Sequence, residues 1–330
     1  METHVSTATD RARRMLAQVL RGLSLSVHAA SEFSSNPKAL DACLAAIAEG
    51  DIIVNAMLFL EEHFKPLLAA LSERRDHCDA MVTIMSAGEV AKLTRMGRFD
   101  MGAPTSGLMS LLKRLRGSRG KTDAAGARQM TMLRRLPKIL RFIPGAAQDV
   151  RAYFLTLQYW LAGSDENMAN MVRFLIDRYA DGPRRALRGG LKPAAPIEYP
   201  EMGLYHPALP GHVCDNPDML PAPATAKGTV GLLVLRSYVL ADNARHYDGV
   251  IAALEARGLK VIPAYATGLD ARPAIEKYFM RNGRPIIDTL VSLIGFSLVG
   301  GPAYNDAKAA EEMLARLDVP YIAAHPVEFQ

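Results

Sequence analysis

The sequence has little cysteine and no long run of apolar residues. Its three cysteines, Cys43, Cys78 and Cys214, are widely spaced and form no Cys-x-x-Cys pair. This argues against a disulfide framework or a zinc site and favours a reducing compartment such as the cytoplasm. No segment approaches the roughly 18 apolar residues of a membrane span, and the first residues lack a signal-peptide pattern. We therefore expect neither a membrane span nor export.

The motifs of several self-contained enzymes are also missing. Gly120-Lys121-Thr122 resembles the end of a phosphate-binding loop, but Leu115 stands where that loop needs its first glycine. The sequence contains no Gly-x-Gly-x-x-Gly after a candidate strand, no Gly-x-Ser-x-Gly and no histidine pair with zinc spacing. We expect no ATP bound by a phosphate loop and no metal site here.

Alternating strand and helix patterns dominate what is present. The composition, 49% hydrophobic and 22% charged, is that of a globular protein. Short apolar runs predict strands at Leu23–His28, Asp51–Met57, Ala80–Met85, Val230–Leu235, Lys260–Ala264, Asp288–Ile294 and Val319–Ala323. Helical spacing predicts helices at Thr7–Leu20, Pro37–Ala48, Leu60–Asp76, Gly107–Arg116, Gln129–Ile143, Ala146–Leu161, Glu166–Tyr179, Asn243–Ala256, Pro273–Met280 and Asp306–Leu317. We expect an α/β protein with two mostly parallel, Rossmann- or flavodoxin-like domains.

The patterns divide the chain into four segments. An α/β domain at 1–102 is followed by a helical region at 103–180, a Pro- and Gly-rich connection at 181–227 and a second α/β domain at 228–330. No strand precedes the first helix and no helix follows the last strand, so we expect the chain to be truncated at both ends.

A dense basic block runs from Lys113 to Arg141, with Asp123 as its only acidic residue. Such a block attracts anionic partners, although a solvated helix face is the plainer interpretation. Nucleic acid is disfavoured because no reader motif or aromatic series accompanies the charge. The candidate residues for an anionic ligand or an acidic protein are Arg134, Arg135, Lys138 and Arg141.

Polar residues follow three of the predicted strands in the second α/β domain. Because the carboxyl ends of parallel strands meet at one edge, they are expected to form a single crevice, near a Gly300-Gly301 turn where backbone can approach a ligand. The candidate residues are Arg236, Tyr304, Asn305, Asp306, His325 and Glu328. In the alternative interpretation Asp306 only caps its helix and the others are structural.

Long ordered strings across nearly the whole chain resemble one family, the H subunit of magnesium chelatase. They are Met85–Glu89, Leu133–Gly145, Gln148–Tyr153, Gln158–Leu161, Gly163–Asn167, Gly231–Ser237, Gly295–Asp306 and Tyr321–Pro326. The cobalt-inserting relative of that subunit is similar mainly from about Tyr205 onward.

The resemblance implies a subunit that binds protoporphyrin IX and hosts Mg²⁺ insertion for chlorophyll or bacteriochlorophyll synthesis. ATP would be hydrolysed by separate AAA+ partner subunits of the I and D type. Much of the metal-insertion cavity would lie beyond Gln330, so this chain alone would be inactive. The alternatives are the cobaltochelatase large subunit and a non-catalytic two-lobed binding protein.

Overall fold

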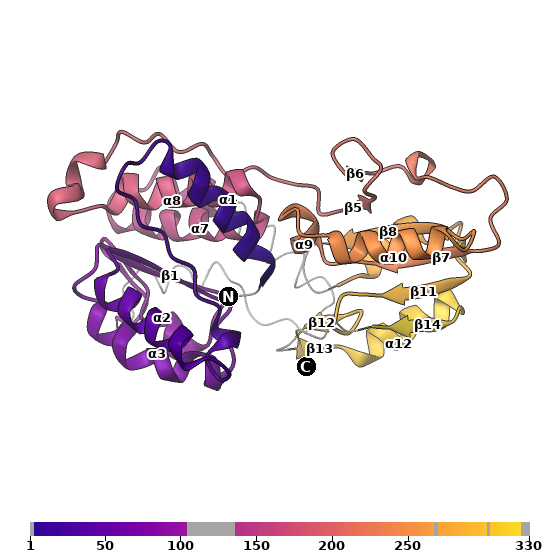
Figure 1. Cartoon of the computed structure of the whole chain (residues 1–330), viewed down its shortest axis with the longest axis horizontal. Coiled ribbons are helices and arrows are strands. Elements are labelled where there is room, and N and C mark those ends of the chain that lie inside the picture. Colours follow the sequence, from indigo (N-terminus) through magenta and orange to yellow (C-terminus); the bar gives the residue numbers. More distant parts are fainter. Residues whose placement is uncertain (1–2, 104–135, 267–269, 302–303, 325–330) are drawn as a thin grey trace. The chain divides into compact units, whose positions relative to one another are not determined.

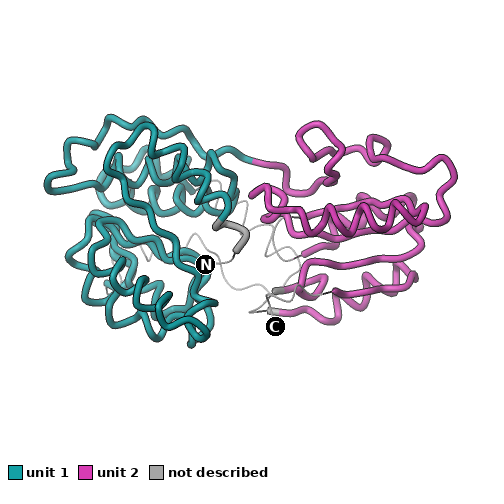
Figure 2. Tube along the Cα trace, viewed as in Figure 1, with its two compact units in different colours: residues 1–198 teal, residues 199–330 magenta. Residues whose placement is uncertain are grey.

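The computed structural model describes residues 3–103, 136–266, 270–301 and 304–324. The chain divides into two compact units, Met1–Glu198 and Tyr199–Gln330 (Figures 1 and 2). Each unit has its own sheet and its own apolar core. Among the described residues, no helix is both long and apolar enough to cross a bilayer.

Unit 1 is built around a four-stranded sheet in the order β1-β2-β3-β4. Its strands are β1 (Ile52–Ala56), β2 (Ala80–Ile84), β3 (Arg95–Met96) and β4 (Phe99–Asp100). The helices of unit 1 that are described from end to end are α1 (Thr3–Ala17), η1 (Ala30–Glu32), α2 (Pro37–Glu49), α3 (Glu61–Arg74), α4 (Gly88–Ala91), α7 (Ala146–Ala162), α8 (Asp165–Tyr179) and η2 (Gly182–Leu187). β1 and β2 are parallel in the register Ile52↔Ala80, and the two short strands are antiparallel.

Helices cover both faces of this sheet. α2 and α3 pack on one face, and α7 and α8 lie on the other (Figure 1). α1 packs against α8 through Ala8, Ala12 and Leu16, which are fully buried. An ion pair between Arg11 and Asp165, with a nitrogen to oxygen distance of 2.5 Å, joins the same two helices.

Local sequence signals set the ends of several helices. Pro37 occupies the first turn of α2, where its missing N–H costs nothing. The Ser164 hydroxyl caps α8 by accepting from the Asn167 N–H. α7 ends at Gly163, whose φ of 61° favours a residue without a Cβ.

The strand predicted at Leu23–His28 is wrong. Residues 23–29 have no regular secondary structure, and β1 pairs only with β2 among the described residues. The segment is rich in apolar residues, but a strand also requires a partner for its peptide groups, and this segment has none in the described sheet.

Unit 2 contains a six-stranded sheet in the order β14-β11-β7-β8-β5-β6. Its strands are β5 (Met202–Tyr205), β6 (Val213–Cys214), β7 (Thr229–Leu233), β8 (Lys260–Ala266), β11 (Thr289–Ser292) and β14 (Tyr321–Ala323). The first four in the spatial order are parallel, whereas β5 runs antiparallel to β8 and β6 to β5. Two short hairpins pair β9 (Met280–Arg281) with β10 (Arg284–Pro285) and β12 (Gly300–Gly301) with β13 (Tyr304–Asn305).

The helices of unit 2 lie on both faces of this sheet. They are η3 (Pro217–Met219), α9 (Arg236–Leu240), α10 (Arg245–Glu255), α11 (Arg272–Tyr278) and α12 (Ala307–Leu317). Leu232 belongs to the core cluster that includes α10, and its neighbour Leu233 to the cluster that includes α11 and α12. Burial on both faces is typical of parallel strands, and the α/β class is confirmed.

The Pro-rich stretch contributes to the fold of unit 2. Unit 2 begins at Tyr199, and residues 199–227 supply β5 and β6 to its sheet. The division into four segments at 102, 180 and 227 stays a prediction.

Candidate functional site

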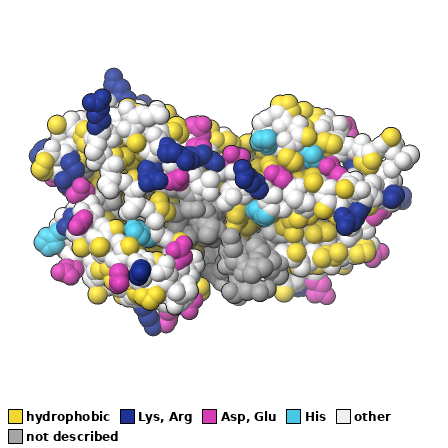
Figure 3. Space-filling view, viewed as in Figure 1, with side chains coloured by type: hydrophobic (Ala, Val, Ile, Leu, Met, Phe, Trp, Pro, Cys, Tyr) yellow, Lys and Arg dark blue, Asp and Glu magenta, His cyan; other side chains and the backbone are white. Residues whose placement is uncertain are grey.

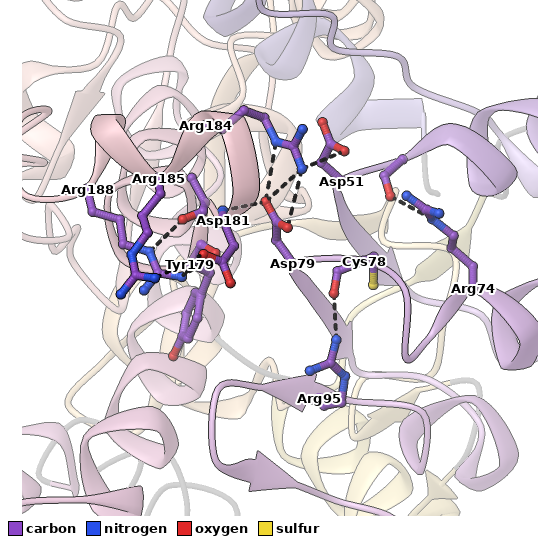
Figure 4. Close-up of polar contacts among 12 residues, drawn as sticks. Asp51, Arg74, Cys78, Asp79, Arg95, Tyr179, Asp181, Arg184, Arg185 and Arg188 are labelled. Carbon is purple, nitrogen blue, oxygen red and sulfur yellow. Dashed lines mark hydrogen bonds and ion pairs between the residues drawn. The ribbon is translucent and has the colours of Figure 1, made fainter.

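A polar cavity of about 670 Å³ lies in unit 1 at the start of β2 (Figure 4). It is lined by Asp76, His77, Cys78, Asp79, Arg95, Gly97, Asp149, Arg178, Tyr179, Asp181, Gly182, Arg184 and Arg188. These residues come from the α3–β2 loop, from β3 and the turn after it, and from α7, α8 and η2. The cavity therefore joins segments that are far apart in the sequence.

Arg184 is the central contact of this cavity. Asp51 and Asp79 stand directly before β1 and β2, so both lie at the amino ends of these parallel strands. The Arg184 guanidinium reaches Asp51 at 3.0 Å and Asp79 at 3.3 Å. The Asp181 N–H donates to Asp79 at 2.8 Å. The two carboxylates are thus held by one cation, and Asp79 by a backbone donor as well.

Two other guanidinium groups bind backbone carbonyls. Arg95 donates to the Arg75 carbonyl at 3.0 Å and to the Cys78 carbonyl at 2.5 Å. Arg188 donates to the carbonyls of Ala180 and Tyr179 at 2.5 and 3.1 Å. These contacts fix the loops that form the cavity wall.

Asp149 anchors the remaining side of the cavity. Its carboxylate accepts from the Tyr179 hydroxyl at 3.0 Å, from Arg178 at 3.3 Å and from the Arg98 N–H at 3.0 Å. Gly97, with φ of 56°, lies so close that a Cβ there would be 2.8 Å from an Asp149 oxygen. Burial, and secondarily Asp149, raises the pKa of Tyr179, so this phenol stays neutral and acts as a donor.

The arrangement suits a structural role better than catalysis. We call the Arg184 ion pairs with Asp51 and Asp79 the brace, because they hold η2 against the start of the two strands. Four arginines face four aspartates in the lining, so the cavity has no excess of either sign. Burial raises the pKa of the Cys78 thiol, which keeps it in the unreactive protonated form. Its polar lining is also a poor match for a flat apolar ligand.

A second cavity, of about 580 Å³, lies in the same unit and is mainly apolar. It is lined by residues 19–28, by all five residues of β1, and by parts of α2 and α8. It has the size and lining of a binding site, and the Asp51, Asp79 and Arg184 ion pairs form part of its wall. Within the described ranges, no group of three or more His, Cys, Asp or Glu residues could hold a metal ion.

The structure describes four of the six residues predicted for the crevice in unit 2. Arg236 begins α9, three residues after β7 ends at Leu233, and donates to the carbonyls of Pro200 and Tyr199 at 2.9 and 3.1 Å. Tyr304 and Asn305 form β13. Asp306 caps α12 by accepting from the Ala309 N–H at 3.0 Å. His325 and Glu328 lie outside the described residues, so the crevice as a whole stays a prediction.

The predicted basic patch is described only in part. Arg134 and Arg135 lie outside the described residues, as does the helix predicted at Gly107–Arg116. Lys138 and Arg141 are exposed, in helical residues 136–140 and the turn after them. Phe142 beside them is 83% exposed. On the face shown in Figure 3, basic and acidic side chains are interspersed over both units.

Sequence reasoning did not identify the brace around Arg184. Its one local signal was an aspartate directly before each of two apolar strands. The partner lies 105 residues after Asp79 in a segment without periodicity, so the pattern gave no indication that these residues meet.

Two family models together match almost the whole chain. A model described as CobN/Magnesium Chelatase matches residues 157–330, and one described as a domain of unknown function, DUF3479, matches residues 1–154.

Curated relatives match over the same range. The chain is 52% identical over 330 residues to the magnesium-chelatase H subunit of Cereibacter sphaeroides and 50% identical to that of Rhodobacter capsulatus. All of this chain is covered in both cases, against 27% of each relative. It is 35% identical over 304 residues to the chloroplastic magnesium-chelatase subunit ChlH of Oryza sativa, covering 87% of this chain and 21% of the relative. The chain thus spans about a quarter of the length of these relatives.

Proposed function

Because the chain belongs to the CobN/magnesium chelatase family, we propose that it forms part of the porphyrin-binding H subunit of a magnesium chelatase. The reaction would be insertion of Mg²⁺ into protoporphyrin IX on the way to chlorophyll or bacteriochlorophyll. The observation that carries this proposal is the 52% identity over all 330 residues to the H subunit of a magnesium chelatase.

Metal insertion and ATP hydrolysis require different chemical groups, which different subunits can supply. A base must remove two pyrrole protons, and oxygen ligands must deliver Mg²⁺. We assign these groups to the part of the subunit outside this chain, and ATP hydrolysis to AAA+ partners of the I and D type in the cytoplasm. Leu115, in place of the first glycine of a phosphate loop, supports ATP use by a partner.

Porphyrin binding and metal insertion by the whole subunit test the proposal. The subunit containing these 330 residues should quench protoporphyrin IX fluorescence saturably and form Mg-protoporphyrin when ATP and the ATPase partners are added. Insertion of cobalt into a corrinoid, with no magnesium insertion, would indicate the cobalt enzyme instead. No porphyrin binding at all would indicate a non-catalytic binding protein.

We also propose that unit 2 carries a ligand crevice at the carboxyl edge of its sheet, as in flavodoxin-like folds. The parallel strands lie in the order β14-β11-β7-β8. Along the chain, β8 is added on one side of β7 and β11 and β14 on the other, so the strand order reverses at β7. Ligands of open α/β sheets bind at such a switch point, outside the carboxyl ends of the strands. Arg236 follows β7, and Asn305 and Asp306 follow β11 along the chain. The proposed crevice is completed by Tyr304, His325 and Glu328.

A double substitution tests this crevice. Arg236→Ala with His325→Ala in the whole subunit should weaken porphyrin affinity or slow chelation. An Arg257→Ala, Arg284→Ala protein, altered at two exposed cations of the same unit, serves as the control. Unchanged affinity and rate in the first protein would show that the crevice residues are only structural.

For the basic patch, we propose contact with an acidic partner or with porphyrin carboxylates. Exposure of Lys138 and Arg141 supports the proposal. Replacing Arg134, Arg135, Lys138 and Arg141 with Gln should weaken partner or porphyrin binding and flatten its dependence on salt. A control with Gln at Arg257, Arg281, Arg284 and Lys308 removes the same charge elsewhere. Equal binding by both proteins at low and high salt would show that the patch is a solvated surface without a binding role.

A further inference from the structure

The free edge of β1 borders the apolar cavity of unit 1. All five residues of β1 line that cavity, and β1 pairs only with β2 in the described part of the sheet. An edge strand presents a row of peptide N–H and C=O groups that can pair with another strand. The cavity therefore has hydrogen-bonding groups along one wall.

The exposure of β1 is unusual for its position in the unit. β2 is fully buried, but Ile52, Ile53 and Val54 of β1 are only half-buried. These three residues form an apolar run that is typical of a strand covered on both faces. The slot beside β1 accounts for their exposure.

The slot is covered on both faces of the sheet. Ala46 and Ile47 of α2 line it from one side, and Val172 and Ile176 of α8 from the other. A strand takes up about 3.3 Å along its axis per residue, about 4.8 Å across the sheet and about 10 Å between layers, or roughly 160 Å³ per residue. A cavity of about 580 Å³ beside β1 is thus large enough for a short strand.

We propose that this slot receives an extended, β-branched strand from the part of the subunit that lies outside these 330 residues. The strand pairs with β1 and packs apolar side chains against α2 and α8. The source follows from length, because the relatives that match the whole chain have 73% of their length outside the match. A slot enclosed between two helix layers also suits a strand of the same fold better than a transient partner. The inference is independent of which metal the subunit inserts.

Peptide binding monitored by hydrogen exchange tests the proposal. Twelve-residue peptides covering the unmatched sequence of the Cereibacter sphaeroides relative are added singly to the 330-residue protein. One peptide, or two overlapping ones, should slow amide exchange at Ile52–Ala56 at least tenfold and raise the melting temperature. In the protein alone, β1 amides should exchange faster than those of β2, which is fully buried and pairs with β1 along its length and with β3 at Ala80 and Met81.

Substitutions in the slot complete the test. Val172→Asp places a charge in the slot at a half-buried position, and Val19→Glu does so at a position that is 62% exposed, where folding is little affected. Both should abolish protection of β1 by the peptide. Leu60→Asp, at an exposed apolar residue outside the slot, should leave it intact.

Three results would overturn the proposal. One is that no peptide protects β1. Another is that β1 exchanges as slowly as β2 in the protein alone, which would mean that the slot is already closed. The third is a dimer whose dissociation exposes β1, since a second copy would then be the occupant.

Discussion

Arg184 shows how a single side chain can join distant segments. It holds Asp51 and Asp79 at the amino ends of β1 and β2, and it belongs to η2, which follows α8. The aspartates could be read from the sequence as residues preceding strands. Their common partner could not, because it depends on how α8 brings η2 back to the sheet.

Loss of Arg184 should therefore destabilise unit 1. The Asp79 side chain is only 11% exposed. In Arg184→Ala it loses the guanidinium and keeps only the Asp181 N–H as a donor among these contacts. We expect the free energy of unfolding in urea to fall by about 1.5 kcal/mol. This is the low end of the range of about 1.5 to 3 kcal/mol for hydrogen bonds to charged groups, because the Arg184 side chain is 40% exposed and its contacts are partly screened.

Arg185 provides the matched control for this change. Its side chain is 73% exposed and lies 4.0 Å from Asp181, so Arg185→Ala should cost less than about 0.5 kcal/mol. An equal loss in both proteins would show that general charge, not the bridge, is responsible.

Tyr159 gives a pH-dependent prediction at the same scale. Burial raises the pKa of Tyr159 to about 12, from about 10 in an unfolded chain. Because the folded pKa is the higher one, the neutral phenol stabilises the fold fully below about pH 10, and this contribution is lost as pH rises toward about 12. The decline in stability over that range should be shallower in Tyr159→Phe.

Ultraviolet titration of tyrosinate checks the assignment. The difference between the wild-type and Tyr159→Phe titrations should show one group ionising near pH 12. A difference curve centred near pH 10 would contradict it. The variant also leaves the Ala194 carbonyl without its hydroxyl donor, which lowers stability at every pH and is separable from the slope.

At the scale of elements, the sequence predicted those helix ends and strands that depend on neighbouring residues alone. Pro37 marks the start of α2, and the apolar runs correctly located β1, β2, β7 and β8. Leu23–His28 failed because pairing is not a local property. β5 and β6 were missed because they are short and lie among prolines, where no periodicity develops.

Asp306 illustrates an element-scale role for a predicted site residue. Its carboxylate caps α12, and removal of such a cap costs about 0.5 to 2 kcal/mol. Asp306→Ala should lower the stability of unit 2 by that amount, whereas Asp306→Ser, which keeps an acceptor, should lose only a few tenths of a kcal/mol. Chemical denaturation of both proteins checks this.

The two Asp306 variants also separate capping from a ligand role. If Asp306→Ser retains stability but the whole subunit loses porphyrin affinity, the carboxylate has a function beyond the cap. If Asp306→Ala is as stable as wild type, the cap contributes nothing.

At the scale of the whole molecule, the boundary between the units differs from the composition shift. In the sequence, the Pro- and Gly-rich stretch gives way to periodic strand and helix patterns at Gly228. Unit 2 nevertheless begins at Tyr199, because β5 pairs with β8. Leu204, Leu209 and Leu220 are buried in the core of that unit. Composition could not show this, since these leucines are scattered among prolines.

Two shortened proteins test where the folding unit begins. Residues 199–330 should melt cooperatively, with slow exchange in β7, β8 and β11. Residues 228–330 lose β5, β6 and three buried leucines, each of which contributes about 1.5 to 3 kcal/mol. This shorter protein should be less stable by at least about 3 kcal/mol. Equal melting temperatures would place the boundary at Gly228.

The packing of α1 against α8 has a consequence for biosynthesis. Arg11 and its partner Asp165 are 154 residues apart, and translation adds about 5 to 20 residues per second. After α1 is made, roughly 8 to 30 seconds pass before α8 exists. During that interval Ala8, Ala12 and Leu16 lack the α8 surface against which they pack. α1 can therefore complete this packing only after α8 has been synthesised, and until then its apolar face stays accessible on the ribosome.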